Sequence, residues 1–145
     1  MIDNVLYLCI YFPQTNKCEM RIELKVNGTK YFAKYSTFAI ASETENFRLQ
    51  LSGYSGDAGD AMLYDKNPDW NIGNMPFSTK DQDHDNYLGY SCAREYHGAW
   101  WYNHCMTSNL NGLWGFSGAK GLNWFPLTLT GNVNFSEMKL RQMKS

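Results

Sequence analysis

The sequence predicts a fold of the α+β class with little helix, in which a central antiparallel sheet is followed by a long loop-rich region. Short segments toward both ends alternate apolar and charged residues, as strands with one buried face do. The middle of the chain is rich in Gly, Asn and Ser, and aromatic residues make up 16% of the sequence. With 145 residues, of which 43% are hydrophobic, the chain is long enough for one domain with a substantial core.

The first two predicted strands form a hairpin. Residues 18–26, CEMRIELKV, alternate charged residues with an apolar face. That face consists of Met20, Ile22, Leu24 and Val26. The pair Asn27-Gly28 follows at once and suits a tight two-residue turn. The returning strand is expected at residues 30–41, KYFAKYSTFAIA.

Two further strands complete the predicted sheet. Residues 46–53, NFRLQLSG, place Phe47, Leu49 and Leu51 on one face. The segment FSEMKLRQM at residues 135–143 alternates again, and we expect it to return to the sheet as the last strand.

The region between these strands, residues 54–121, has almost no periodicity and needs a covalent or ionic constraint. The chain has four cysteines and no metal-type Cys-x-x-Cys pair, so disulfides are favoured. A bond between Cys92 and Cys105 would close a loop and stabilise the folded state by about 3 kcal/mol. Cys9 and Cys18 could pair with each other, stay free or bond another chain.

Residues 1–12, MIDNVLYLCIYF, contain a short apolar run without the basic start or cleavage site of a signal peptide. The run is too short to span a bilayer. We therefore expect a buried strand here and no membrane span, and we interpret the chain as a domain truncated at its amino terminus.

Charge and motifs argue against several function classes. The net charge is −1 with acidic and basic residues interspersed, so nucleic acid is not an expected partner. Neither a Gly-x-Ser-x-Gly elbow nor a His-Glu-x-x-His motif occurs, and the prediction is that the protein is not an enzyme. His84, His97 and His104 lack the spacing of a zinc site.

The segment DQDHDNYLG at residues 81–89 holds alternate aspartates that repel one another. A hard cation such as Ca²⁺ would reverse that repulsion, because it takes oxygen ligands from carboxylates and carbonyls. The segment is not an EF-hand, since Asn86 and Cys92 stand where that motif needs Gly and Glu. A solvated acidic turn without an ion is the alternative.

The ordered succession FSTKDQDHD, CA, GAWWYNHC, SNLNG and EMKLR resembles the fibrinogen C-terminal domain family, which includes ficolins, tachylectins, angiopoietins and tenascins. The resemblance runs from about Phe12 to the end, and it implies that the family's amino-terminal subdomain is missing. It implies a sheet subdomain over about residues 12–60, a loop-rich calcium and ligand subdomain over about 61–125, and a return strand over 126–145.

The resemblance implies a calcium site in the acidic segment. Its ligands would be the side chains of Asp83 and Asp85 and the backbone carbonyls of Tyr87 and Gly89, with Asp81 behind them. The chain has one residue more than the family pattern between Gly89 and Cys92, after these ligands.

The resemblance also implies a pocket for acetyl groups beside the calcium loop. Tyr96 and Ala119 match pocket residues, and the bond between His104 and Cys105 matches a cis peptide whose following amides, those of Cys105 and Met106, would face an acetyl oxygen. The match is incomplete, because Met106 replaces a histidine and Gly118 stands near where a second tyrosine would be. The expected pocket is therefore shallow or takes a different ligand.

Two residue classes have less specific interpretations. The tryptophans Trp100, Trp101, Trp114 and Trp124 are expected in the core rather than on a sugar platform, because such rings bury large areas. Asn27 and Asn134 begin glycosylation sequons.

The leading hypothesis is a secreted, calcium-binding recognition domain of the lectin type, binding carbohydrate or acetylated groups in innate immunity. The rival is a protein-binding module for signalling or matrix adhesion, of the angiopoietin or tenascin type. A truncated product without independent function is the third possibility. Family members assemble through an upstream coiled coil, so an oligomer would need contacts or segments that the sequence does not reveal.

Overall fold

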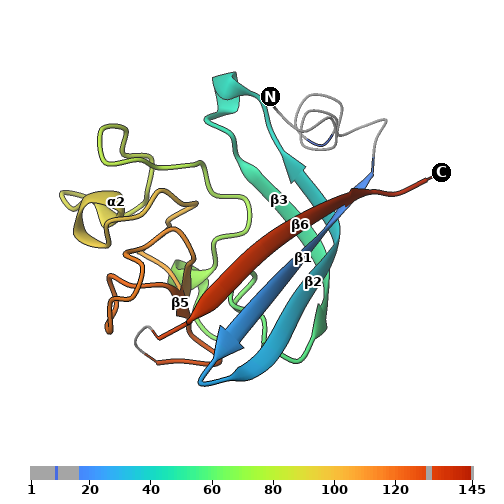
Figure 1. Ribbon diagram of the computed structural model, residues 1–145. Coiled ribbons are helices and arrows are strands. Elements are labelled where there is room, and N and C mark those ends of the chain that lie inside the picture. The colour runs from blue at the N-terminus through green and yellow to red at the C-terminus, as the bar shows by residue number, and fades with distance from the viewer. Residues whose placement is uncertain (1–8, 10–16, 130–131, 145) are drawn as a thin grey trace.

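The computed structural model describes residues 9, 17–129 and 132–144, and it is built on one four-stranded antiparallel sheet (Figure 1). The strand order is β3-β2-β1-β6. The strands are β1 (Cys18–Val26), β2 (Thr29–Ile40), β3 (Leu49–Gly56) and β6 (Phe135–Gln142). The remaining elements are short: η1 (Glu43–Glu45), η2 (Pro68–Trp70), α2 (Cys92–Glu95), β4 (Ser108–Asn109) and β5 (Asn123–Trp124). The predicted class, sheet-rich with little helix, is confirmed.

The β1–β2 hairpin forms as predicted. Strand β1 has the expected bounds, and Met20, Ile22 and Leu24 are at most 2% exposed. Val26 pairs with Thr29 across the turn, whose two residues have φ values of 48° and 84°. Two consecutive positive φ values match the twist of antiparallel strands, and the Asn-Gly pair tolerates them.

Strand β3 begins later than predicted. Asn46 and Phe47 have φ values of 51° and 52°, so the chain turns in the left-handed region and enters the strand only at Leu49. Phe47 precedes the strand and is 38% exposed, so its predicted place on one strand face with Leu49 and Leu51 is wrong. Its carbonyl oxygen instead accepts a hydrogen bond from Trp101 Nε1 at 2.9 Å. Leu49 is buried and Leu51 half-buried on one face, as expected.

The last strand joins the first. Strand β6 pairs antiparallel with β1, from Cys18 opposite Gln142 to Lys25 opposite Phe135. The predicted return of residues 135–143 to the sheet is therefore confirmed.

The amino-terminal prediction is only partly open to comparison. The strand expected over residues 1–12 lies outside the described residues, apart from Cys9, which is helical and buried. Cys9 forms a disulfide with Cys18, with an S–S distance of 2.01 Å, so the open question about this pair is resolved.

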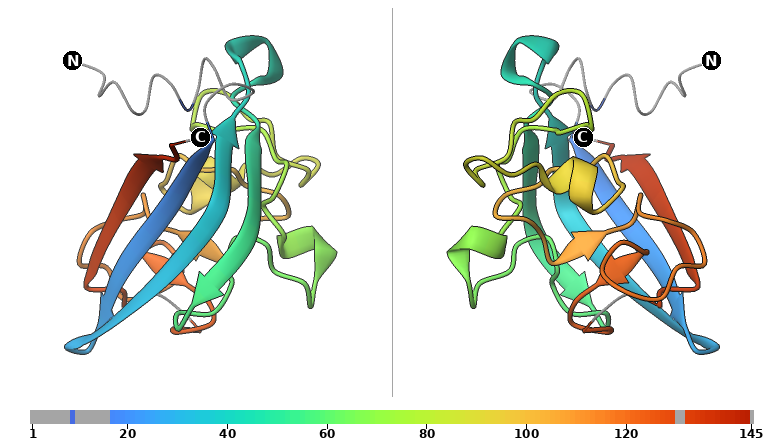
Figure 2. Two further views of the ribbon diagram at one scale, coloured as in Figure 1. Left: turned by 90° about the vertical axis from the view of Figure 1, so that its right-hand side faces the viewer. Right: turned by 90° about the vertical axis from the view of Figure 1, so that its left-hand side faces the viewer.

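The loop-rich segments pack on one face of the sheet (Figure 2). Large aromatic side chains fill the space between the two, and Tyr35, Trp100 and Trp124 are completely buried. Trp101 is 7% exposed, so three of the four tryptophans predicted for the core are confirmed there. The fourth prediction is wrong, because Trp114 lies in an irregular segment and is 71% exposed.

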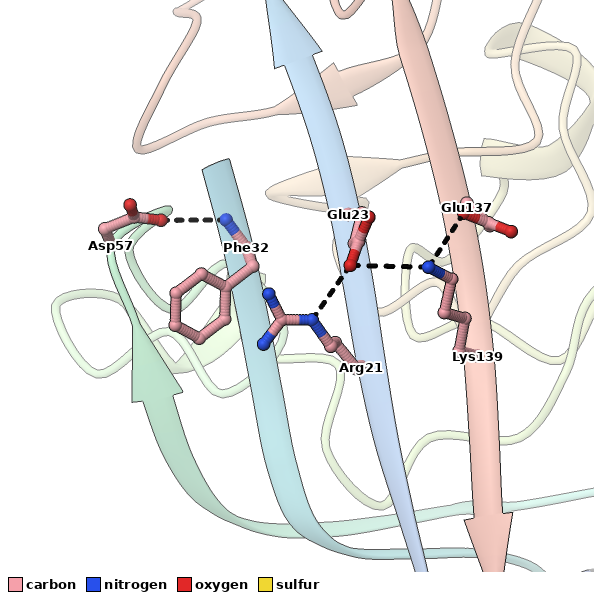
Figure 3. A network of polar contacts seen from close by, with 6 residues as sticks. All are labelled: Arg21, Glu23, Phe32, Asp57, Glu137 and Lys139. Carbon is pink, nitrogen blue, oxygen red and sulfur yellow. Dashed lines mark hydrogen bonds and ion pairs between the residues drawn. The ribbon is translucent and has the colours of Figure 1, made fainter. Parts of the chain in front are cut away.

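The other face of the sheet carries a chain of ion pairs (Figure 3). Glu23 contacts Arg21 at 3.0 Å and Lys139 at 3.4 Å, and Lys139 also contacts Glu137 at 3.2 Å. The Arg21 guanidinium lies 4.0 Å from the centre of the Phe32 ring. These pairs join β1, β2 and β6 through side chains as well as backbone.

Glu19 is the most enclosed acid of this face, and its ion pairs predict a loss of stability in acid. It contacts Lys34 at 3.0 Å and also Arg141. The hydrogen bond from Lys34 is the main cause that lowers the pKa of Glu19 below 4.5. A carboxyl with a lowered folded-state pKa stabilises the fold above its unfolded pKa, and this contribution is lost as the pH falls through the folded-state value.

The Glu19→Gln variant should therefore show a smaller fall in melting temperature than the parent protein when the pH drops from about 6 to about 3. Glu45→Gln, at an exposed position in η1, is the control and should behave as the parent does. Equal falls in the parent and in Glu19→Gln would contradict the assigned role.

Candidate functional site

One cavity of about 240 Å³ brings together the residues that the resemblance assigned to a ligand pocket. Its lining includes Tyr96, His104, Cys105, Met106 and Ala119. These residues come from the end of α2, from the loop before β4 and from the loop before β5. Their convergence is a finding of the structure, whereas their role in binding stays a prediction.

The loop of residues 103–107 forms one wall of the pocket. The peptide bond between His104 and Cys105 is cis, as the resemblance implied. Asn103 N donates to Cys105 O at 2.8 Å, which closes a tight turn around that bond. Cys105 is joined to Cys92 with an S–S distance of 2.04 Å, so the predicted disulfide is confirmed.

The short helix η2 holds this loop through its backbone carbonyls. Asn103 Nδ2 donates to Pro68 O at 3.1 Å, and His104 N donates to Asp69 O at 2.9 Å. The single hydroxyl proton of Thr107 is shared between Ala61 O, which is the nearer acceptor, and Trp70 O at 3.3 Å. Each carbonyl of η2 therefore anchors the wall of the pocket.

The position of Tyr96 depends on a buried asparagine. Asn109 Nδ2 donates to Tyr96 O at 3.1 Å, and Asn109 Oδ1 accepts from Tyr102 Oη at 2.8 Å. Asn109 and Tyr102 are both 0% exposed, and burial raises the pKa of the Tyr102 phenol. The amide thus satisfies a buried hydroxyl and fixes the backbone beside the pocket at the same time.

The acidic segment folds into a tight turn around Asp85. Its carboxylate accepts hydrogen bonds from Tyr87 N at 2.8 Å and from Cys92 N at 2.9 Å. Asp83 Oδ1 accepts from Asp85 N at 3.2 Å. Burial raises the pKa of Asp85, and the neighbouring Asp83 carboxyl raises it further against the effect of the amide hydrogen bonds. Asp83 is therefore close enough to disfavour the charged form of Asp85.

Asp81 lies apart from this pair. Its carboxylate accepts a hydrogen bond from Thr79 Oγ1 at 2.7 Å, which is the main cause that lowers the pKa of Asp81. The carbonyl of Tyr87 accepts from Tyr90 N at 3.0 Å and keeps a second lone pair. Gly89 is exposed, with a φ of 76° that few other residues adopt.

The acidic turn touches the pocket directly. The ring centres of Tyr87 and His104 are 3.9 Å apart, and Tyr87 also lines the cavity. A second link runs through Asp85, whose carboxylate accepts a hydrogen bond from the amide of Cys92. Cys92 is in turn the disulfide partner of Cys105 in the pocket. The extra residue between Gly89 and Cys92 leaves this second link intact.

Within the ranges that the structure describes, no three His, Cys, Asp or Glu side chains gather as a metal site. A cation at the acidic turn would therefore need backbone carbonyls beside Asp83 and Asp85. No helix among the described residues is long and apolar enough to cross a membrane.

Comparison with known proteins identifies the family. A family model described as the C-terminal globular domain of fibrinogen beta and gamma chains matches residues 10–143. The chain belongs to the fibrinogen C-terminal domain family. Fibrinogen-like domains are non-enzymatic binding modules, as predicted for this chain.

Sequence relatives are longer proteins that contain such a domain. Fibrinogen-like protein A of Apostichopus parvimensis is 39% identical over 145 residues, which cover 96% of this chain and 47% of that protein. Tenascin-R of Rattus norvegicus is 36% identical over 125 residues, covering 85% of this chain and 9% of that protein. The chain thus spans less than half of each.

Solved structures of the family share the fold. The fibrinogen-like globe domain of human ANGPTL6 matches with a TM-score of 0.83 at 30% identity, covering 97% of this chain and 63% of that one. Lamprey fibrin D-dimer, complexed with the peptide ligand Gly-His-Arg-Pro-amide, matches with a TM-score of 0.79 at 28% identity, covering 92% and 49%.

Sequence reasoning missed several residues of the pocket. Trp70, Thr107, Asn123 and Phe125 also line the cavity. The Asn67-Pro68 pair is a turn signal that could have indicated η2. No local sequence pattern indicates the contact between Trp70 and Phe125. The centres of these two rings are 5.8 Å apart.

The predicted glycosylation asparagines lie away from the pocket lining and are exposed. Asn134 Oδ1 accepts a hydrogen bond from Asn27 N at 2.8 Å, so the two sequons meet at the β1–β2 turn. Glycosylation of Asn27 and Asn134 stays a prediction.

The Asn109→Ala variant should lose about 1–3 kcal/mol of unfolding free energy, because it leaves the buried Tyr102 hydroxyl without its partner. Urea denaturation measures this loss. Asn111→Ala is the matched control, since Asn111 is exposed and its amide makes one bond, to Ala99 O at 2.9 Å. Equal losses of unfolding free energy in both variants would show that the buried hydrogen bonds of Asn109 stabilise the fold no more than the exposed bond of Asn111.

Proposed function

We propose that this fibrinogen-like domain is a calcium-dependent recognition module that binds neutral acetylated sugars in the pocket beside the acidic turn. The observation that carries the proposal is the chemistry of the lining. Aromatic rings and small polar groups form the cavity, and His104 is the only ionisable side chain apart from tyrosines among the described residues that line it. Such a lining suits a neutral ligand with an apolar methyl group and polar hydroxyls.

Two backbone amides supply the donors that an acetyl oxygen needs. No hydrogen bond from the amides of Cys105 or Met106 to another described residue is found, although Cys105 is 7% exposed. Buried amides are nearly always paired, so unpaired ones beside a cavity favour an acceptor on a ligand. Aromatic rings such as Tyr96 would cover the methyl group.

The acidic turn has a donor set that fits a calcium ion. Asp83 and Asp85 offer hard carboxylate oxygens, and the carbonyls of Tyr87 and Gly89 follow within the same turn. A bound cation would neutralise two carboxylates whose proximity is unfavourable without one. It would also order Tyr87, which contacts His104 in the pocket.

The compartment that we propose is extracellular. Both disulfides join cysteines of the same chain, and the described residues contain no free cysteine. Disulfides of this kind persist in oxidising environments.

A peptide or protein ligand is the second candidate. The lamprey fibrin fragment was solved with the peptide Gly-His-Arg-Pro-amide, which shows that one fibrinogen-like relative takes a basic peptide. A basic peptide favours an acidic partner in its site. Among the described residues, the pocket lining contains no acidic side chain, which favours the neutral sugar.

Calcium should stabilise the protein through the acidic turn. At about a hundredfold excess over Kd, a ligand of the folded state adds about 2.7 kcal/mol, which corresponds to a rise in melting temperature of roughly 5–10 °C. Asp83→Asn and Asp85→Asn should abolish most of this rise. Asp81→Asn is the control and should keep it, because Asp81 is bonded to Thr79 instead. An equal rise in all variants would refute the ligand assignment.

Binding of N-acetylglucosamine, with glucose as the unacetylated control sugar, tests the pocket. Ala119→Trp places a large ring in the cavity and should weaken binding by at least about tenfold in titration calorimetry. Ser117→Trp adds the same ring at an exposed neighbour that does not line the cavity, and it should bind as the parent does. If the parent bound no acetylated sugar with calcium present, a protein or peptide partner would replace the sugar as the proposed ligand.

A further inference from the structure

Three aromatic side chains form a rim along one side of the pocket. Tyr64, Trp70 and Phe125 contact one another, with ring centres 5.7 Å apart between Tyr64 and Phe125 and 5.8 Å apart between Trp70 and Phe125. The ring centres of Tyr64 and Trp70 are 6.2 Å apart. Trp70 and Phe125 also line the cavity, so this aromatic rim is continuous with the pocket.

The indole of Trp70 is held in place yet open to a ligand. Its ring planes make angles of 31° with Tyr64 and 66° with Phe125, so neither neighbour lies flat against it. The residue is 36% exposed, so part of the side chain is accessible to a ligand. An exposed and immobilised indole offers a large contact surface at a small cost in conformational entropy.

The backbone of η2 fixes the rim without help from the indole. Asn67 caps the helix by accepting from Asp69 N at 3.0 Å, and Pro68 occupies its first turn. The carbonyls of Asp69 and Trp70 bind the loop of residues 103–107, as described above. Replacing the Trp70 side chain therefore leaves every one of these hydrogen bonds in place.

The size of the cavity limits what it can enclose. Pockets that bury a whole drug-sized ligand measure about 300–1,000 Å³. The present cavity, at about 240 Å³, is smaller and suits one terminal group. The rest of a longer ligand must lie outside, and the aromatic rim is one surface that it can cross.

We infer that the rim is a second sugar subsite, in which the penultimate ring of an acetylated oligosaccharide stacks on Trp70 while the terminal acetylated sugar occupies the pocket. This inference rests on the proposed function. Both the rim and the ring faces of a sugar are uncharged, and the carbon-bound hydrogens of a pyranose pack well on an aromatic face. The site therefore binds at least two sugar units rather than a single acetyl group.

The test compares N-acetylglucosamine with its β1,4-linked disaccharide by titration calorimetry in calcium. The parent protein should bind the disaccharide about tenfold more tightly than the monosaccharide, the gain expected of one well-packed aromatic contact. Trp70 also lines the cavity, so Trp70→Ala should weaken the disaccharide by a several-fold larger factor than the monosaccharide and thereby remove most of this gain. Trp70→Phe should keep part of the gain, and this variant replaces Trp70→Ala in the comparison if the alanine variant does not fold.

The control is Trp114→Ala, which removes an exposed tryptophan that is not part of the pocket lining. It should leave both affinities unchanged. If Trp70→Ala kept the full preference for the disaccharide, the rim would not be a subsite, although the pocket would stand. If Trp70→Ala weakened both sugars equally, Trp70 would belong to the terminal-sugar site instead. If the parent bound neither sugar, the proposed function and the rim would both fail.

Discussion

The fold depends on buried aromatic side chains whose polar atoms bond to the backbone of irregular segments. Backbone carbonyls in a region without regular structure still need donors when they are buried. Trp124 Nε1 supplies one to Ala58 O and Gly59 O at 3.2 and 3.0 Å, and Trp101 Nε1 supplies another to Phe47 O. Each ring buries a large apolar area and satisfies a loop carbonyl with the same side chain. The loop-rich half is thereby fixed to the sheet with hardly any helix.

The pocket and the acidic turn share one supporting structure. The loop of residues 103–107 is bonded to η2 on one side and tied by the disulfide to Cys92 on the other. The Asp85 carboxylate accepts a hydrogen bond from the amide of Cys92, so Cys92 connects the acidic turn to the pocket wall. A cation bound as we propose would act on the ligand site along this path, since anything that orders Asp85 also orders Cys92.

The residues that form the pocket all lie in the part of the fold that this chain shares with its relatives. The family model matches residues 10–143, and the described residues that line the cavity all fall between Trp70 and Leu129. The sheet serves as the platform for this half. Its opposite face is held by the ion pairs of Glu19 and Glu23, which join β1 to its neighbours on both sides.

The sequence by itself determined the sheet and the family. Alternation of apolar and charged residues located β1 and β6, because each side of a strand meets a different environment. Motif succession allowed the pocket residues around Cys105 to be named by resemblance. Only the tertiary structure decided that Phe47 turns outward, that η2 supports the pocket and that Trp70 meets Phe125. Local periodicity reports which side of a strand is buried, whereas contacts between irregular segments arise from hydrogen bonds and packing between residues remote in sequence, which no local pattern encodes.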